Sequence, residues 1–498
     1  MRASASTFGP TALAGSQNPP WMSFLSIPTM EIIRTPPARI VRGLTSIAFV
    51  FLFVPGCSSS GSQSDGGGDS SAGASSSGGS ASGSSGSASG SGGPSGASSS
   101  GSGSSSGSAA SSSGGEGPDA GSTGSDASIA DVAAADGAGD ATAQAGDGAA
   151  GSVWTGTWAS APDGTCTAAV GQTVRSIVHT SIGGNAARVR ISNAHGNGPL
   201  HISNVHLAQR TTGSSIDPAT DTALTFAGQP DVTVPASSFA LSDGASFVVK
   251  PTSDVVVSFF VMSSSGGTCQ QNAFQTNYMA AGDMVSSPSL NGGQNQNYLY
   301  ILGLDVQNPA AEGAVVALGA SITTGFRAPA DTNMRWPNLL AARLVDANRT
   351  IGVLNEGISG DITSGALSRF DRDVLSQTGV KWVIFSDNPI NDLGGRSTPT
   401  NDINQIKMMM SMAHAKGVKF LCSTLTPYTP DEPARTTVID FIKSAGSGCD
   451  GIVDQDTATH DPAAPTMWAP QFNSGDGLHP NAAGMQAIAN CVDLTLFK

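Results

Sequence analysis

The sequence predicts an α/β domain built on a parallel sheet, preceded by an all-β domain and by a disordered Gly/Ser-rich linker. Three observations support this prediction. After residue 312, apolar runs of strand length alternate with helical segments, which is typical of a parallel sheet covered on both faces. Between residues 152 and 308, short alternating runs recur between turn residues, and residues 58–151 are almost entirely Gly, Ser and Ala. We therefore divide the chain into residues 1–57, 58–151, 152–308 and 313–498.

The C-terminal part contains the strands and helices of the predicted α/β domain. Buried strands are expected in the apolar runs at 314–318, 382–385, 418–424 and 451–453. Helices are expected at 336–345, 401–416 and 433–445, and a final helix at 481–496 starts beside Pro480 and Asn481. Because parallel strands end at one edge of the sheet, polar residues that follow them are the candidates for function.

The middle part has the period of two that marks half-buried strands. Examples are residues 176–182, 187–192, 231–234, 246–249 and 255–261, separated by Gly, Asn, Ser and Pro turns. No sustained helical periodicity occurs there. We predict a β-sandwich or jelly roll over 152–308.

Residues 1–57 end in a pattern typical of an exported lipoprotein. Arg39 and Arg42 precede an apolar run at 44–53, and about ten apolar residues are too few to span a bilayer as a mature helix. The small residue before Cys57 resembles a bacterial lipobox, so we expect a lipid on Cys57 that anchors the protein to a bacterial membrane, at the outer membrane or cell surface. The alternative is ordinary cleavage beside an incidental cysteine, which would give a secreted protein.

Residues 58–151 contain no Lys, Arg or aromatic residue. Such a segment cannot bury enough apolar surface to offset its ordering entropy, so we expect a disordered tether with a root-mean-square reach of about 55 Å. Much of the net charge of -14 comes from acidic residues of this tether. Since no cluster of Lys and Arg is present to neutralise phosphates, we exclude nucleic-acid binding.

The other five cysteines cannot all pair within one chain. We expect a disulfide between Cys166 and Cys269, which flank strands of the β segment. Cys422 lies in an apolar run and is expected as a buried thiol, which leaves Cys449 with Cys491 as a second pair. No Cys or His cluster has metal-ligand spacing, so no metal or other cofactor is expected.

A serine, a histidine and an aspartate are placed as nucleophilic catalysis requires. Ser321 follows the run 314–318, at a point where an α/β sheet exposes a nucleophile. Asp476 precedes His479 by three residues, on a turn that leads into the final helix. We predict His479 as the base and Asp476 as the group that orients it. His460, beside Asp461, is the alternative base, but it lacks the helix entry.

Residues 313–498 resemble the SGNH/GDSL family of serine hydrolases, and the β segment resembles the N-terminal domain of some exported bacterial members. Four blocks carry the resemblance: residues 319–325 with Ser321, 355–361 with Gly360, 389–395 with Asn391, and 476–480 with Asp476 and His479. The resemblance implies a three-layer, flavodoxin-like parallel sheet. It also implies an oxyanion site made by the backbone N–H groups of Ser321 and Gly360 and the Asn391 amide.

Two residues beside these positions depart from the family pattern. Ala320 replaces the aspartate of Gly-Asp-Ser, and Pro389 replaces the glycine of Gly-X-Asn-Asp. We interpret the missing aspartate as a loop-bracing residue, so that Ala320 reduces precision without abolishing chemistry. Asn388 is a rival to Asn391 for the oxyanion role.

The resemblance implies an exported serine esterase that forms an acyl-enzyme on Ser321. Its expected substrates carry short acyl groups, such as O-acetyl esters on polysaccharides. A lipase or lysophospholipase is the alternative within the enzyme class. An alternative of another class is a surface glycan-binding protein with a degenerate hydrolase domain. In that protein Trp154, Trp158, Tyr298 and Tyr300 would stack on sugars, unless they form core packing.

Overall fold

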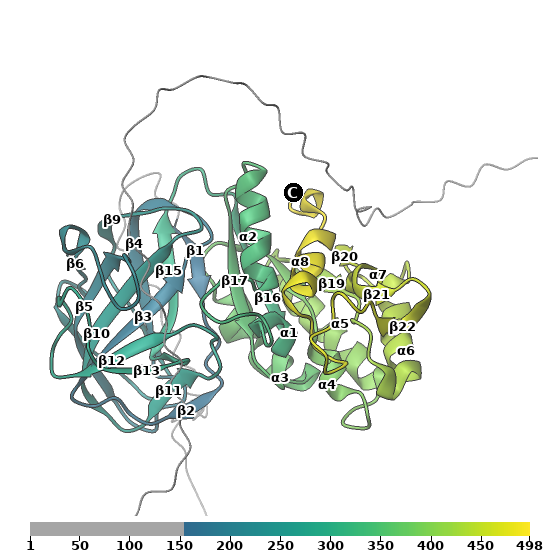
Figure 1. Ribbon diagram of the computed structural model, residues 1–498, viewed down its shortest axis with the longest axis horizontal. Coiled ribbons are helices and arrows are strands. Elements are labelled where there is room, and N and C mark those ends of the chain that lie inside the picture. The colour runs from purple at the N-terminus through teal and green to yellow at the C-terminus, as the bar shows by residue number, and fades with distance from the viewer. Residues whose placement is uncertain (1–153) are drawn as a thin grey trace, which may run out of the picture. The chain divides into compact units, whose positions relative to one another are not determined.

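The computed structural model describes residues 154–498 (Figure 1). The predicted export signal with Cys57 and the predicted linker at 58–151 lie outside the described residues. The described chain has a β-rich part, coloured blue to teal in Figure 1, followed by an α/β part coloured green to yellow.

The β-rich part contains two larger antiparallel sheets and one small one. The first sheet has the order β1 (Trp154–Ala159), β15 (Ile301–Gln307), β4 (Gly184–Ser192) and β8 (Phe239–Leu241), with β9 (Ala245–Val249) also pairing with β4. The second has the order β13 (Gly293–Asn295), β12 (Asn277–Ala281), β3 (Gln172–His179), β10 (Asp254–Ser264), β5 (Leu200–Gln209) and β6 (Thr222–Ala223), with β7 (Asp231–Val234) on β5. The small sheet joins β14 (Tyr298–Leu299), β11 (Gly267–Gln270) and β2 (Gly164–Cys166), and a 3-10 turn, η1, spans Pro218–Thr220.

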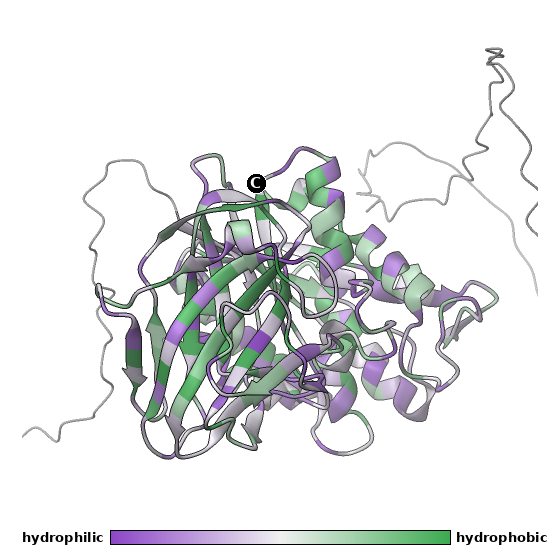
Figure 2. Cartoon of the chain, turned by 60° about the vertical axis from the view of Figure 1, so that its left-hand side comes forward, coloured by the Kyte–Doolittle hydropathy of each residue, from purple (hydrophilic) through white to green (hydrophobic). Residues whose placement is uncertain are grey.

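Side chains of the two larger sheets share one hydrophobic core. Val189 and Leu304 come from the first sheet, whereas Val257 and Phe259 come from the second, and all four are fully buried. Hydrophobic and hydrophilic residues alternate along the strands in Figure 2, as the period of two requires. The prediction of a β-rich domain is confirmed.

The α/β part is built on a five-stranded sheet in which every neighbouring pair is parallel. Its order is β17 (Ile351–Gly357), β16 (Gly313–Gly319), β18 (Val380–Phe385), β19 (Lys419–Ser423) and β20 (Gly451–Val453). In chain order this is 2-1-3-4-5, the flavodoxin-like arrangement, and its topological switch point lies between β16 and β18. The α/β prediction is therefore confirmed.

Eight α-helices accompany this sheet in the described chain. The α-helices are α1 (Ser321–Thr324), α2 (Trp336–Asp346), α3 (Thr363–Ser368), α4 (Asn388–Asp392), α5 (Pro399–Ala415), α6 (Glu432–Lys443), α7 (Gln455–Thr459) and α8 (Ala482–Cys491). Helix α2 packs against α8, while α5 packs against both α3 and α6. The remaining elements are η2 (Asp371–Leu375), η3 (Thr429–Asp431), η4 (Leu494–Leu496) and the hairpin of β21 (His460–Asp461) and β22 (Ala464–Trp468).

The final helix is shorter than the predicted 481–496. Helix α8 ends at Cys491, because Val492 adopts an extended backbone conformation, and the chain continues into η4. At its start, the Asn481 side chain accepts a hydrogen bond from the Gly484 N–H at 3.0 Å and so caps the helix.

The described residues contain two disulfides. Cys166 and Cys269 are bonded, with Cα atoms 5.9 Å apart, and they join β2 to β11. Cys422 is bonded to Cys449, with Cα atoms 5.8 Å apart. The predictions of a Cys422 thiol and of a Cys449–Cys491 pair are therefore wrong.

The physical reason for the second disulfide is the pairing of β19 with β20. This pairing brings the segment just before β20 alongside β19, and Cys449, two residues before Gly451, is close enough to bond Cys422. Cys491 lies on α8 instead. Its thiol is buried and donates a hydrogen bond to the Ile488 carbonyl oxygen at 3.2 Å.

Strand β17 lies at an edge of the parallel sheet, and the β-rich part covers it. The N–H of Val353 in β17 donates to the Ser181 hydroxyl at 2.9 Å, and β1 packs along β17. Near this edge, the N–H of Gly156 in β1 also donates to the carbonyl of Thr378, which precedes β18, at 2.9 Å. An edge strand that is covered in this way does not expose its backbone groups to another chain.

Candidate active site

The turn after β16 holds Ser321 at the carboxyl edge of the parallel sheet. Residues 314–318 of β16 are fully buried, and Ser321 is the first residue of the short helix α1. Since β16 borders the switch point, Ser321 lies where open α/β sheets form their ligand crevice.

Ser321, His479 and Asp476 are joined by hydrogen bonds. The Ser321 Oγ lies 2.9 Å from His479 Nε2, and His479 Nδ1 lies 2.9 Å from Asp476 Oδ2. Because the carboxylate can only accept, we assign the ring proton to Nδ1, which leaves the Nε2 lone pair to accept the proton of the Ser321 hydroxyl. The structure thus brings together the three residues that the sequence predicted.

Asp476 is held in its ionised form by its own turn. Its Oδ1 accepts the N–H groups of Leu478 at 3.0 Å and His479 at 2.8 Å. Partial burial alone would raise the pKa of Asp476, but these bonds and the His479 ring outweigh it and hold that pKa well below its ordinary value. The carboxylate is therefore an acceptor throughout the pH range in which proteins are normally studied.

The segment 355–361 comes next to the Ser321 turn through a backbone hydrogen bond. The N–H of Ile358 donates to the Gly319 carbonyl at 3.1 Å. Gly360 has φ +80°, a conformation that favours glycine, and no atom lies within 4 Å of the place where a Cβ would stand. Within residues 154–498, the N–H groups of Ser321 and Gly360 donate to no protein acceptor, so both are available to a developing oxyanion.

Asn391 lies beside this segment, on α4. Its Nδ2 donates to the Asp361 carbonyl at 2.8 Å, which uses one of its two amide protons and leaves the other without a protein acceptor within residues 154–498. Asn388 is placed differently: it is fully buried and its Nδ2 donates to the Asp361 carboxylate at 3.0 Å. The geometry therefore favours Asn391 over Asn388 as a donor to bound substrate.

Arg369 ties the loops of the site together. Its guanidinium donates to the carbonyl oxygens of Gly319 at 3.1 Å and Glu356 at 2.9 Å, and its Nε donates to the Asp361 carboxylate at 2.9 Å. It thereby joins the end of β16 to both ends of the segment 356–361. Sequence reasoning did not single it out, because no local pattern marks a residue that acts across loops.

Two neighbours of the His479–Asp476 pair were also missed. The Phe326 ring lies 4.5 Å from the His479 ring, and it also meets the Phe274 ring of the β-rich part at 5.8 Å. The Arg327 Nε lies 3.2 Å from Asp476 Oδ2, and the Arg327 side chain is half exposed. Both residues follow Ser321 by only a few positions, and this closeness in the chain was the one indication in the sequence that they lie at the site.

Asp387 is a further residue that the sequence did not indicate. It follows β18, is 2% exposed, and its carboxylate accepts the N–H groups of Ala320 at 2.9 Å and Ile322 at 2.8 Å. These are the two residues that flank Ser321. The only local signal was its place just beyond an apolar strand.

The structure separates the remaining candidates from the site. His460 lies on β21, and its closest acidic neighbour is Asp456 at 3.6 Å, not Ser321. Trp158, Tyr298 and Tyr300 are buried in the core of the β-rich part, so they cannot form an exposed sugar platform. Within residues 154–498, no three His, Cys, Asp or Glu side chains are grouped to hold a metal ion.

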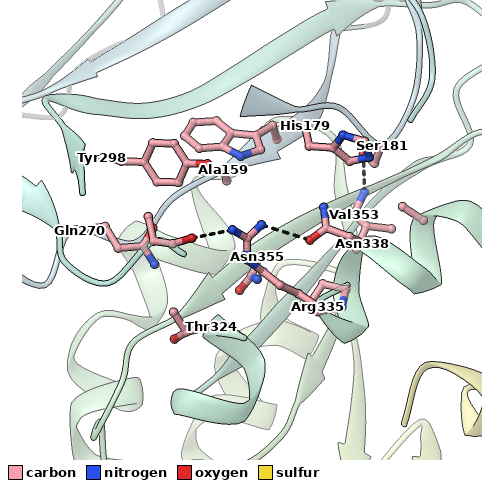
Figure 3. A pocket seen from close by; sticks show the side chains of 14 residues that line it. Ala159, His179, Ser181, Gln270, Tyr298, Thr324, Arg335, Asn338, Val353 and Asn355 are labelled. Carbon is pink, nitrogen blue, oxygen red and sulfur yellow. Dashed lines mark hydrogen bonds between the residues drawn. The ribbon is translucent and has the colours of Figure 1, made fainter. Parts of the chain in front are cut away.

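A small cavity of about 30 Å³ lies between the β-rich and the α/β parts (Figure 3). The Arg335 guanidinium crosses it and donates to the Ala273 carbonyl at 2.5 Å and to Asn338 Oδ1 at 3.4 Å. Burial lowers the pKa of Arg335 from its ordinary value. Because one water needs roughly 10–15 Å³, this cavity is far too small for an ester substrate.

Comparison with known proteins assigns the α/β part to a family model. The model described as "GDSL-like Lipase/Acylhydrolase family" matches residues 317–487. A search of the curated proteins finds no match. No helix within residues 154–498 is both long and apolar enough to cross a membrane.

Solved structures similar to this chain include three bacterial proteins. A lipolytic protein of the G-D-S-L family from Desulfitobacterium hafniense DCB-2 is 22% identical, with 36% of this chain and 97% of that chain covered and a TM-score of 0.32. The lipase/acylhydrolase from Enterococcus faecalis is 22% identical, with 36% and 92% covered and a TM-score of 0.29. A lipolytic G-D-S-L protein from Veillonella parvula DSM 2008 is 17% identical, with 35% and 93% covered and a TM-score of 0.30.

Proposed function

We propose that this chain, whose residues 317–487 are a GDSL-like lipase/acylhydrolase domain, is an exported serine esterase that hydrolyses short-chain or O-acetyl esters of carbohydrates. The family match supports a carboxylic ester hydrolase. The observation that carries the proposal is the continuous hydrogen-bonded chain from Ser321 through His479 to Asp476.

In the proposed reaction, Ser321 Oγ attacks the ester carbonyl carbon while its proton passes to His479 Nε2. The carbonyl oxygen becomes an oxyanion, which accepts hydrogen bonds from the N–H groups of Ser321 and Gly360 and from Asn391 Nδ2. The bond to the alcohol oxygen then breaks, and that oxygen takes the proton from Nε2. An acyl-enzyme on Ser321 remains.

The second half of the reaction repeats these roles with water. His479 Nε2 accepts a proton from the water as its oxygen attacks the acyl carbon, and the proton returns to Ser321 Oγ when the acyl bond breaks. Asp476 stays ionised and stabilises the imidazolium formed in both halves. The products are the carboxylic acid and the free enzyme.

The preference for short acyl groups rests on the surface beside the nucleophile. The exposed large hydrophobic residues of the described chain are Val170, Phe239, Leu241, Val248, Met262, Met284, Met408, Ile452 and Met467. None of them belongs to the segments that form the site. A long acyl chain would therefore find only partly exposed apolar side chains there, such as Phe326 and Leu478, which disfavours a lipase or lysophospholipase.

Export is part of the proposal. The basic and apolar segments before Cys57 support a lipid anchor, and the linker at 58–151 would hold the hydrolase away from the membrane.

The test of function is labelling of the purified protein with a fluorophosphonate, with Ser321→Ala as the inactive variant and Ser368→Ala, an exposed serine on α3, as the matched control. Stoichiometric labelling is expected for the parent and for Ser368→Ala, and none for Ser321→Ala. Hydrolysis rates on nitrophenyl esters of increasing chain length, on acetylated xylan and on lysophospholipid then define the substrate. Faster turnover of long-chain or lysophospholipid esters would favour the lipase alternative, and an unlabelled parent would favour the binding protein.

A further inference from the structure

The nucleophile turn lacks the side-chain cap that usually begins a helix. Ala320 occupies the N-cap position of α1, and its methyl group cannot accept a hydrogen bond. It is also the position at which the Gly-Asp-Ser pattern of the family has its aspartate. The N–H groups around Ser321 must therefore find an acceptor elsewhere.

Asp387 supplies that acceptor from the end of the neighbouring strand β18. Its Oδ1 accepts the Ala320 N–H at 2.9 Å and the Thr323 hydroxyl at 2.6 Å, and its Oδ2 accepts the Ile322 N–H at 2.8 Å. The side chain is 2% exposed, so these protein donors replace the water that a carboxylate would otherwise bind.

The packing around this carboxylate leaves no spare room. A Cβ on Gly319 would stand 2.4 Å from Asp387 Oδ1 and 2.0 Å from Thr323 Oγ1. The Trp336 Nε1 also donates to Thr323 Oγ1 at 3.3 Å, which fixes that hydroxyl from its other side. The glycine before Ala320 is thus required by Thr323 and Asp387 together, because a Cβ would overlap both side chains.

The pattern of donors links Asp387 to the chemistry. The carboxylate accepts hydrogen bonds from the N–H groups of Ala320 and Ile322, on either side of Ser321. The N–H of Ser321 itself therefore remains available to an oxyanion. With both flanking peptides fixed, Ser321 Oγ is held 2.9 Å from His479 Nε2.

From these contacts we propose that Asp387 is the positioning residue of the nucleophile turn: it caps α1 from the end of β18 and so replaces the carboxylate that position 320 lacks. The proposal rests on the proposed function of Ser321. Asp387 touches no reacting atom. It acts through the backbone of residues 320 and 322.

The first experiment replaces Asp387 in the full chain. Asp387→Asn retains the shape but points an amide N–H at a backbone N–H, so the turn loses its alignment. We expect kcat on nitrophenyl acetate to fall roughly 10- to 100-fold, as misplacements of about 1 Å do, while KM changes less than about threefold. The matched control is Asp454→Asn, because Asp454 caps α7 from the same edge of the sheet through Thr457 at 3.2 Å. That control should lower the melting temperature but leave kcat within about twofold of the parent.

The second experiment moves the carboxylate to the local cap. Ala320→Asp is made in the parent and in the Asp387→Asn protein, and kcat, fluorophosphonate labelling rate and melting temperature are measured for all four proteins. In the parent, a second buried carboxylate beside Asp387 should lower all three. In the Asp387→Asn protein, the new aspartate can accept from the first turn of α1, so all three should rise.

A reversal of sign in kcat and in the labelling rate is what a merely structural role of Asp387 would not produce. If Ala320→Asp lowers kcat in both backgrounds, or if Asp387→Asn keeps the parent kcat, Asp387 does not position the nucleophile. The melting temperatures test the cap separately from the chemistry: a parent without Ser321-dependent turnover would defeat the proposed function, whereas an unreversed sign in the melting temperatures would defeat the cap.

Discussion

Asn388 and Asn391 lie three residues apart on α4, yet their amides have different partners. Asn388 is fully buried against the Asp361 carboxylate, whereas Asn391 donates to the Asp361 backbone carbonyl and has a second amide proton without a protein acceptor within residues 154–498. Pro389 lies between them, at the first turn of the helix, where its missing N–H costs no hydrogen bond. The departure from the family glycine is therefore compatible with α4.

At this residue scale, the two asparagines should differ in their effect on rate. Removing a donor from an oxyanion site costs about 10²- to 10³-fold in kcat, so Asn391→Ala should lose activity on that scale with little change in KM. Asn388→Ala should instead lower the free energy of unfolding by about 1–3 kcal/mol, because it leaves the mostly buried Asp361 carboxylate without one donor. Steady-state kinetics and urea unfolding of both variants check this. A larger loss of kcat in Asn388→Ala would reverse the assignment.

The helices that position the site also carry charged side chains that take no part in the proposed reaction. Helix α5 starts near the site edge of the sheet and carries Asp402 in its first turn, 1% exposed. Burial, with a smaller contribution from the charge of Asp392, raises the pKa of Asp402 to about 6. In the unfolded chain the pKa of an aspartate is about 3.9.

The sign of the resulting pH dependence follows from this difference. Between about pH 4 and pH 6 the unfolded chain loses the Asp402 proton first, so the contribution of Asp402 to stability is full below about pH 4 and is lost as pH rises through about 6. Asp402→Asn should therefore raise the free energy of unfolding at pH 7.5, by about 3 kcal/mol at most, and give no gain at pH 4. Denaturant unfolding at both pH values measures it, with Asp440→Asn, an exposed aspartate on α6, as the control. An equal effect of Asp402→Asn at the two pH values would contradict the assignment.

Across the whole molecule, β1 of the β-rich part lies against the edge strand β17 of the parallel sheet. The fit is close because both strands have a glycine at the contact: a Cβ on Gly352 would stand 2.0 Å from the Gly156 carbonyl oxygen. Strand β17 leads directly into the segment that carries Gly360. The contact between the two parts therefore supports one wall of the site.

Gly352→Ala is expected to force the two strands apart. Overpacking of this kind costs about 1–3 kcal/mol, so the melting temperature should fall by several degrees, and kcat should fall because β17 positions Gly360. Gly293→Ala is the matched control, since no atom lies within 4 Å of its Cβ position. Calorimetry of the full chain with parallel kinetic assays tests the prediction. A melting temperature within about one degree of the parent would show that β1 and β17 can move apart without loss of stability, which would contradict the prediction.

Sequence patterns predicted correctly those features of the fold and the site that depend on residues close together in the chain. The run 314–318 is apolar at every position and is buried at every position, and Asp476 reaches His479 because they are three residues apart on one turn. Patterns failed where distant segments meet. The Cys422–Cys449 bond depends on β19 and β20 being neighbours in the sheet. Helix α8 stops at Cys491, where Val492 is extended, although the sequence predicted a helix to 496.

The sequence by itself determined the parallel sheet, the β-rich part and the order of the blocks that hold Ser321, Asn391, Asp476 and His479, because strand burial and turn spacing are local properties. Only the tertiary structure decided which carboxylate holds the nucleophile turn. Asp387 lies 66 residues from Ser321 in the chain, and it reaches the turn because β16 and β18 are neighbours in the sheet. No periodic pattern in the sequence indicates a hydrogen bond of that kind, because the bond depends on which strands are neighbours in the sheet.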